Sequence, residues 1–159
     1  MKEISNAVIK EAMPKTDVGS LVDSADGICR GACVVQVFDR KAVANKTHLL
    51  GAYLNAILAF KNHTNRSKSL GMEMLLFASL TDQINDAIKT AGAKAGSKVV
   101  VFASSDVAFS KIRPMLKDVA DFNPSAAHQD QVLKRLRVSS EGNTCYRILQ
   151  AMAVSRLGT

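Results

Sequence analysis

The stretch from residue 47 to residue 80 contains two apolar segments that must be buried, and this requirement constrains the fold more than any other feature of the sequence. In residues 47–60 apolar side chains recur at helical spacing, which predicts a helix with a wide buried face. Residues 70–80 carry a single charge, Glu73, and their length and their Leu and Met content predict a second buried helix. The narrow polar strip of the first helix consists of His48, Gly51, Asn55 and Asn62.

Sequence patterns typical of β-strands occur both before and after these two helices in the sequence. The clearest covers residues 98–103, whose sequence Lys-Val-Val-Val-Phe-Ala is rich in β-branched side chains. Weaker strand patterns cover residues 4–12, 32–38 and 118–122. A short helix and turn are predicted over residues 18–27, and helices over residues 105–116 and 144–157. Another helix is predicted to start at Asn123 or Ser125 and to run to Arg137, and a brief helical turn is predicted over residues 40–44.

Another helix is predicted to begin at Ser79-Leu-Thr-Asp82, which has the composition of a capping box, and to end at Gly92. Its expected core face consists of Ile84, Ala87, Ile88 and Ala91. Three or four strands among so many helices predict an α/β (α+β-like) fold with a single small sheet, mainly antiparallel or mixed, packed with several helices. The length of 159 residues fits one domain over residues 1–159.

The charge of the chain is concentrated in residues 40–70, which carry six Lys or Arg residues and no Asp or Glu. The whole chain has a formal net charge of +7. Such a skew is not needed for folding and predicts an acidic partner, with nucleic acid as the leading candidate. Trp is absent and aromatic residues are few, so RNA recognition is expected to use grooves, backbone amides and charge rather than a stacking platform.

No apolar stretch approaches the roughly 20 residues of a membrane-spanning helix, and the first residues lack the apolar core of a signal peptide, so a cytoplasmic location without a membrane partner is expected. A Gly-rich phosphate loop is absent, and neither a cofactor nor a small-molecule substrate is expected. The histidines are scattered, so a metal site is not expected either.

The three cysteines, Cys29, Cys33 and Cys145, do not form a zinc pattern and are expected to be small apolar residues in a reducing compartment. The sequence does not predict an enzyme. One catalytic alternative stays open, because Cys33 and His48 could meet in space as a nucleophile and its base.

Four pieces of sequence occur in the order and spacing of a known family. They are Gln36-Val-Phe-Asp39, Thr47-His-Leu-Leu-Gly-Ala52, Met72-Glu-Met-Leu-Leu76, and Asp82-Gln-Ile-Asn-Asp-Ala-Ile88 followed by Gly92. With these pieces the chain resembles the small kinase-binding (TPRKB-like) subunit of the KEOPS complex. The resemblance covers roughly residues 35–102 and is looser over residues 148–157.

The resemblance implies a protein that is not itself a catalyst. KEOPS installs a threonylcarbamoyl group on the adenosine beside the anticodon of ANN-decoding tRNAs. The subunit docks on the N-lobe of the small kinase/ATPase of the complex (Bud32/PRPK type) and captures the single-stranded CCA end of tRNA. The alternative from a different class is a generic basic protein that binds structured RNA without recognising its end.

The expected RNA site centres on the basic loop before the second buried helix. Arg66 and Lys68 are expected to contact phosphates, and Glu73 to pair with one of them, which would satisfy a partly buried carboxylate and orient the cations. Asp82 stands where family members often have Arg, so the site is expected to depend on Arg66 and Lys68. Further expected RNA contacts are Gln83, Ile84, His48 and Asn55.

The closing helix is the expected kinase-binding element. Ile148, Leu149 and Met152 share one side of it, and the simplest alternative is that they belong to the core.

Overall fold

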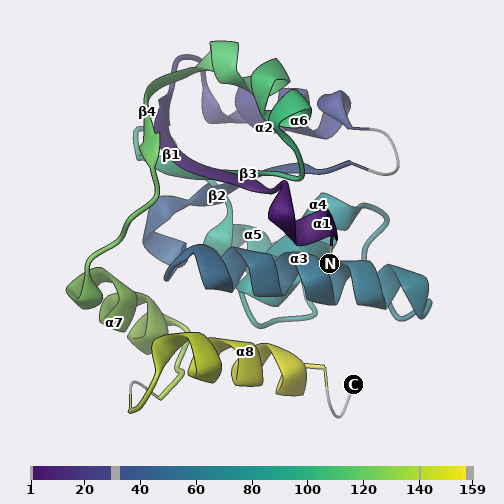
Figure 1. Ribbon diagram of the computed structural model, residues 1–159, viewed down its shortest axis with the longest axis vertical. Helices are drawn as coiled ribbons and strands as arrows, with labels where there is room; N and C mark the ends of the chain where they lie inside the picture. Colours follow the sequence, from purple (N-terminus) through teal and green to yellow (C-terminus); the bar gives the residue numbers. More distant parts are fainter. Residues whose placement is uncertain (1, 30–32, 140, 157–159) are drawn as a thin grey trace. The chain divides into compact units, whose positions relative to one another are not determined.

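The computed structural model describes residues 2–29, 33–139 and 141–156, and the chain divides into two compact units (Figure 1). The sheet unit comprises Met1–Arg40 and Gly92–Phe122, and the helical unit comprises Lys41–Ala91 and Asn123–Thr159. Each unit therefore combines two segments that are distant in sequence. The single domain over residues 1–159 stays a prediction.

The sheet unit contains a four-stranded sheet in the order β2-β3-β1-β4. Every neighbouring pair of strands is antiparallel, which confirms the predicted small antiparallel sheet. The central strand β3 is buried along its whole length, which explains its continuous apolar sequence. The strands are β1 (Val8–Pro14), β2 (Val35–Asp39), β3 (Val99–Ala103) and β4 (Leu116–Asp121).

Two helices, α2 (Val18–Ile28) and α6 (Asp106–Ile112), lie side by side on one face of this sheet (Figure 1). The side chain of Asp17 caps α2 by accepting a hydrogen bond from the backbone N–H of Ser20, and Ser105 caps α6 in the same way. The helix predicted over residues 105–116 ends early and continues as the 3-10 turn η2 (Arg113–Met115), because Pro114 lacks the N–H that a longer helix needs.

The N-terminal segment differs from its prediction. Lys2–Ser5 form a short helix, α1, and β1 begins only at Val8. The strand is set by its partners, since Val8 pairs with Ala103 of β3 and Pro14 pairs with Leu116 of β4.

The expectation for the cysteines is wrong for two of them. Cys29 and Cys33 form a disulfide with a Cα–Cα distance of 5.2 Å, within the range that such bonds require. Helix α2 ends at Ile28, and Cys29 follows it directly with an extended backbone. Cys145 has a free thiol.

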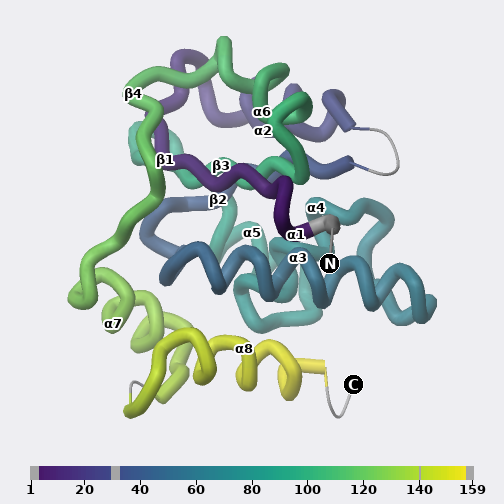
Figure 2. The backbone as a smooth tube through the Cα atoms, viewed as in Figure 1, coloured from purple at the N-terminus to yellow at the C-terminus, as the bar shows by residue number. Residues whose placement is uncertain are grey.

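The helical unit is built around α3 (Lys46–Lys61), which packs against α4 (Leu70–Ala78) and against α8 (Thr144–Val154) from the end of the chain (Figure 2). α5 (Ile84–Ala91) contacts α4, and α7 (Ala126–Arg135) contacts α8. The predicted helical turn after β2 is present as η1 (Arg40–Ala42). Among the described helices, none is both long and apolar enough to cross a bilayer.

The connection between α4 and α5 corrects the predicted capping box. The hydroxyl of Ser79 donates to the carbonyl oxygen of Leu75 at 2.6 Å and so closes the end of α4 instead of opening the next helix. The chain then turns through Leu80, whose φ of 57° is left-handed, and α5 begins only at Ile84.

Gly51 allows α3 and α8 to approach closely. A Cβ atom at this position would overlap Cδ2 of Leu149 and lie 3.4 Å from the sulfur of Met152. Ile148 and Met152 are fully buried at this end of the unit. The residue predicted to belong to a polar strip therefore serves as the packing surface for the last helix.

Candidate nucleic-acid interface

The basic loop, residues 62–69, connects α3 to α4 through a network of local hydrogen bonds. The backbone N–H of Thr64 donates to the carbonyl oxygen of Ala59 at 2.8 Å, which closes the end of α3. The side-chain amide of Asn65 donates to the carbonyl oxygen of Ser67 at 2.9 Å. Ser69 accepts a hydrogen bond from the N–H of Met72 and caps α4. The loop is thus anchored to a helix at each end.

The carboxylate of Glu73 fixes the middle of this loop. Its side chain is fully buried in the first turn of α4. One oxygen, Oε2, accepts the backbone N–H groups of Arg66 at 3.0 Å and Ser67 at 2.9 Å, and the Ser67 hydroxyl lies 2.9 Å away. A buried carboxylate needs such donors to offset the loss of hydration, and the start of a helix also favours negative charge.

The ion-pair partner of Glu73 is Arg156, which follows α8. Its Nη2 donates to the other carboxylate oxygen, Oε1, at 2.8 Å. The guanidinium carbon lies 4.2 Å from the centre of the Phe77 ring, one turn further along α4. The expectation that Glu73 pairs with Arg66 or Lys68 is wrong, because backbone amides of the loop and Arg156 occupy the carboxylate.

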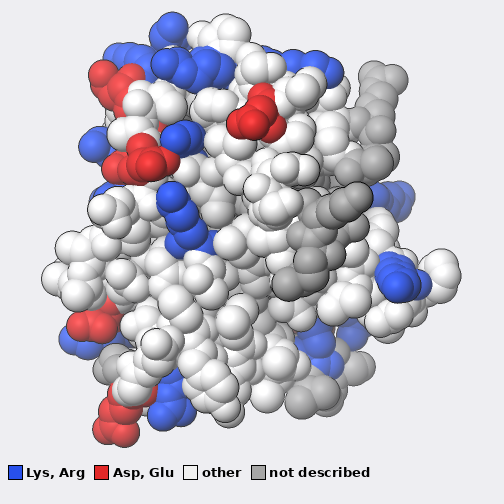
Figure 3. Space-filling model, viewed as in Figure 1, with Lys and Arg blue, Asp and Glu red and all other residues white. Residues whose placement is uncertain are grey.

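Arg66 and Lys68 consequently keep exposed side chains. Neither forms an ion pair with any residue in the described part of the chain. Together with exposed Lys61 at the end of α3 they form the basic surface of the helical unit. Lys and Arg side chains are visible around the end of α3 and the loop that follows (Figure 3).

Arg40, at the start of the acid-free window, has a different environment. Its Nε donates to Glu11 at 2.6 Å, and its guanidinium lies 5.6 Å from the centre of the Phe122 ring. Arg40 is therefore neutralised within the sheet unit. Of the other five cations of residues 40–70, Lys61, Arg66 and Lys68 belong to the basic loop and the end of α3, whereas the exposed Lys41 and Lys46 lie in η1 and at the start of α3.

Gln83 and Ile84 lie at the start of α5, and both side chains are exposed. The side-chain amide of Gln83 donates to Oδ1 of Asp82 at 3.0 Å. Ile84 and Ile88 are 41% and 45% exposed, so their assignment to the core is wrong. The small Ala87 and Ala91 are buried in their place, and α5 presents an apolar patch to its surroundings.

His48 is not available to RNA, and its predicted contact is wrong. The ring is fully buried, with Nδ1 accepting the N–H of Ala44 at 3.0 Å and Nε2 lying 2.9 Å from the carbonyl oxygen of Ala78. An amide N–H can only donate, so Nδ1 is unprotonated and Nε2 carries the hydrogen. Burial lowers the pKa of His48 to about 4 and keeps the ring neutral.

Asn45 caps the start of α3, because its Oδ1 accepts the N–H of His48 at 2.9 Å. Asn55, the other polar-strip residue proposed for RNA, is half-buried and donates its side-chain amide to the carbonyl oxygen of Gly51 at 2.8 Å. The structure thus brings Arg66, Lys68 and Glu73 together, whereas the side chains of His48 and Asn55 form hydrogen bonds within the protein.

The residues expected to bind the kinase divide between the core and the surface. Ile148 and Met152 are fully buried, so direct contact with a partner is excluded in this conformation, whereas Leu149 is 39% exposed. Two further side chains of α8, Tyr146 and Val154, are 64% and 53% exposed. Sequence spacing placed the three residues on one side of the helix but did not show which of them are buried by the neighbouring helices and which are exposed.

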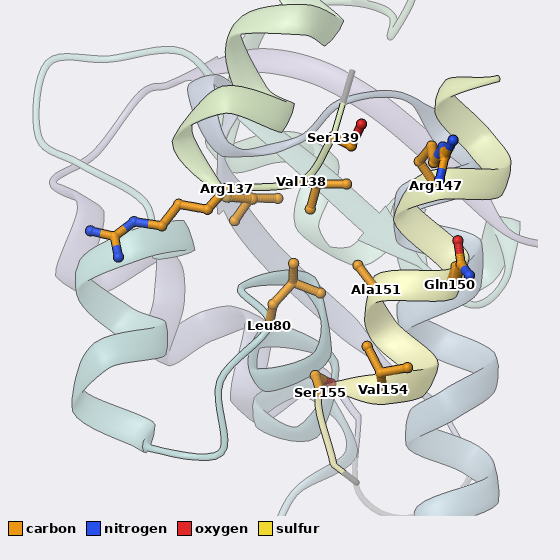
Figure 4. A pocket seen from close by; sticks show the side chains of 10 residues that line it. Leu80, Arg137, Val138, Ser139, Arg147, Gln150, Ala151, Val154 and Ser155 are labelled. Carbon is orange, nitrogen blue, oxygen red and sulfur yellow. The ribbon is translucent and has the colours of Figure 1, made fainter. Parts of the chain in front are cut away.

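A pocket of about 440 Å³ lies between α8, Leu80 and the segment after α7 (Figure 4). Val138, Ala151 and Val154 point toward it, whereas the guanidinium of Arg137 points away (Figure 4). Its lining comprises Leu80, Leu136, Arg137, Val138, Ser139, Arg147, Gln150, Ala151, Val154 and Ser155. None of the residues predicted for RNA lines this pocket.

Nucleophilic catalysis by Cys33 and His48 is contradicted by the chemistry of both groups. The sulfur of Cys33 is bonded to Cys29, and both ring nitrogens of His48 have backbone partners. Among the described residues, no group of His, Cys, Asp and Glu is arranged to hold a metal ion.

The fold, a single four-stranded antiparallel sheet with helices, defines a small α+β protein. The family model described as "Kinase binding protein CGI-121" matches residues 2–155, so the chain belongs to the CGI-121 family. The "Regulatory protein Cgi121" of Methanocaldococcus jannaschii is 30% identical over 125 residues, which cover 77% of this chain and 83% of that protein. These findings confirm the resemblance to the kinase-binding, TPRKB-like subunit.

Proposed function

We propose that this protein is a non-catalytic, cytoplasmic subunit of the KEOPS complex that binds the small kinase/ATPase of the complex and recruits tRNA through its CCA end. The observation that carries the RNA part is the pair of exposed cations, Arg66 and Lys68, on a loop whose backbone is fixed by Glu73. A fixed loop presents its charges to phosphates with little loss of conformational entropy on binding.

The kinase part of the proposal is supported by family membership and by the exposed apolar side chains of α8. Tyr146 and Leu149 provide the aromatic and aliphatic contacts that protein interfaces favour, and Val154 extends them toward the end of the helix. Ile148 and Met152 support this surface from inside the unit.

Recognition of the CCA end is tested by comparing the affinity of the protein for intact tRNA with its affinity for the same tRNA without the three terminal nucleotides. We expect the truncated tRNA to bind at least tenfold more weakly, because the proposed site holds the single-stranded end. The measurement is a titration at fixed salt, followed by competition with a duplex RNA of equal charge. Equal affinity for both tRNAs, with full competition by the duplex, would instead establish a generic structured-RNA-binding protein.

The kinase surface is tested by Tyr146→Asp and, separately, Val154→Asp. Each places a charge on the proposed interface, and we expect the affinity for the KEOPS kinase to fall at least tenfold. Val107→Asp is the matched control, because Val107 is 68% exposed on α6 of the sheet unit. Calorimetric titration measures the affinity, and unchanged binding by both variants of α8 would contradict this surface.

A further inference from the structure

Helix α8 and the basic loop are connected through one buried carboxylate. We propose that the Glu73–Arg156 pair couples them, so that binding of a protein on α8 and binding of RNA on the basic loop influence each other. Glu73 and Arg156 are then positioning residues of the RNA site, and neither touches the RNA. The inference rests on the proposed function for the identity of the ligands, whereas the coupling itself rests on the geometry of the pair.

The two oxygens of Glu73 bind two different parts of the unit. Oε2 accepts its hydrogen bonds from the basic loop, at the N–H groups of Arg66 and Ser67. Oε1 accepts from Arg156, two residues after the end of α8 at Val154. A rotation of the carboxylate therefore moves the acceptors of both segments at once.

The position of Arg156 is set by α8. The backbone N–H of Ser155 donates to the carbonyl oxygen of Ala151 at 3.0 Å, so the helical hydrogen bonds continue to the residue before Arg156. A displacement of the last turn of α8 by a bound protein would be transmitted to the guanidinium.

Burial makes this contact strong enough to transmit a displacement. The side chain of Glu73 is 0% exposed and that of Arg156 is 15% exposed. In such surroundings a charged hydrogen bond is stronger than in water, and a carboxylate that loses its cation is costly to leave in place. The ring of Phe77, at 4.2 Å, gives the guanidinium a defined plane.

The coupling predicts effects in both directions. When Arg156 holds Glu73, the loop amides are bonded and Arg66 and Lys68 are presented in one arrangement, which lowers the entropic cost of RNA binding. By thermodynamic linkage, RNA bound to the loop stabilises the last turn of α8 to the same extent.

The test compares Arg156→Gln with the control Arg147→Gln. The control removes the same charge from α8, and Arg147 donates a hydrogen bond to the carbonyl oxygen of Glu141 instead of to Glu73. For Arg156→Gln we expect faster hydrogen exchange at the amides of Arg66 and Ser67 and about fivefold to tenfold weaker binding of tRNA with a CCA end. The salt dependence of binding should stay as in the wild type, because Arg156 contacts no phosphate. In the wild type, tRNA should slow exchange at Ser155, and in the variant this effect should disappear.

Several outcomes would overturn the inference. A lower salt slope in Arg156→Gln would make Arg156 a direct phosphate contact, and unchanged exchange at Arg66 and Ser67 would remove the coupling. If Arg156→Gln does not fold, Arg156→Lys keeps the charge but loses the planar contact with Phe77, and intermediate exchange rates and affinity are expected. A wild type that does not bind tRNA would contradict the proposed function, while the exchange measurements would still decide the coupling.

Discussion

The free energy of unfolding should fall by about 3 kcal/mol between pH 6.5 and pH 4 because of a single side chain, His48. Its pKa is lowered to about 4 in the folded protein by burial, against 6.5 for an exposed histidine. Between these values the unfolded chain binds a proton that the folded chain does not, so stability rises with pH across this window and is lost on acidification.

The physical reason is the fixed hydrogen bonding of the ring. A protonated His48 would place a second N–H against the N–H of Ala44, since Nδ1 accepts that bond at 3.0 Å. The charge would also have no water around it, because the ring is 0% exposed. Acidification is therefore expected to destabilise the contact between α3 and the end of α4, where His48 hydrogen-bonds to the carbonyl oxygen of Ala78.

Denaturant unfolding at several pH values measures this effect. His48→Gln is the informative variant, because its amide can accept from Ala44 and donate to Ala78 without titrating. Between pH 6.5 and pH 4 the free energy of unfolding should fall by about 3 kcal/mol more in the wild type than in His48→Gln. His63→Asn is the control, since His63 is exposed and its φ of 56° is one that Asn tolerates. Identical pH profiles for the wild type and His48→Gln would contradict the prediction.

Reversing the charges of Arg66 and Lys68 together should strongly weaken tRNA binding. The double variant Arg66→Glu, Lys68→Glu replaces two attractive interactions with repulsive ones on the basic loop, and we expect the affinity to fall by about one to two orders of magnitude. The salt dependence should also become shallower, by about 0.7 in slope for each phosphate that the loop no longer binds. Fluorescence anisotropy at several salt concentrations gives both quantities.

The control for this experiment is Lys111→Glu with Lys117→Glu. Both lysines are exposed in the sheet unit, and their reversal changes the net charge of the chain by the same amount. If the two double variants weaken tRNA binding equally, net charge rather than the basic loop accounts for binding. Because both Arg66 and Lys68 are exposed, stability should be unaffected, and retained kinase binding would show that the fold is intact.

The sequence predicted the elements of this fold better than their contacts. The helices α3 and α4 and the strand β3 were predicted to within about two residues, because each has a strong periodic or β-branched pattern. Local chemistry moved the boundaries elsewhere, as at Pro114, which ends α6 early, and at Ser79, which closes α4 instead of opening α5.

The candidate site could be predicted only in part, because its decisive contact joins residues far apart in sequence. Arg66 and Lys68 were found from the missing acids around them, and Glu73 from its apolar setting. Arg156 is separated from Glu73 by 83 positions, and no local pattern identifies such a partner.

Periodicity also left open which face of a helix is covered. In α5 the isoleucines and alanines share the predicted face, yet the alanines are buried and Ile84 and Ile88 are exposed. In α3 the nearly continuous apolar surface hid the fact that His48 lies inside. Both outcomes depend on how closely neighbouring helices approach, which is a property of tertiary packing.

The shape of the proposed kinase-binding surface on α8 depends on Gly51, a residue of α3. Leu149 lies over this glycine and is also one of the partly exposed apolar residues of α8. A side chain at position 51 would push Leu149 outward. This would change the shape of the exposed surface of α8, although residue 51 is itself buried beneath that helix. Relatives that carry a larger residue here should therefore need a compensating smaller residue at position 149, and the two positions should vary as a pair.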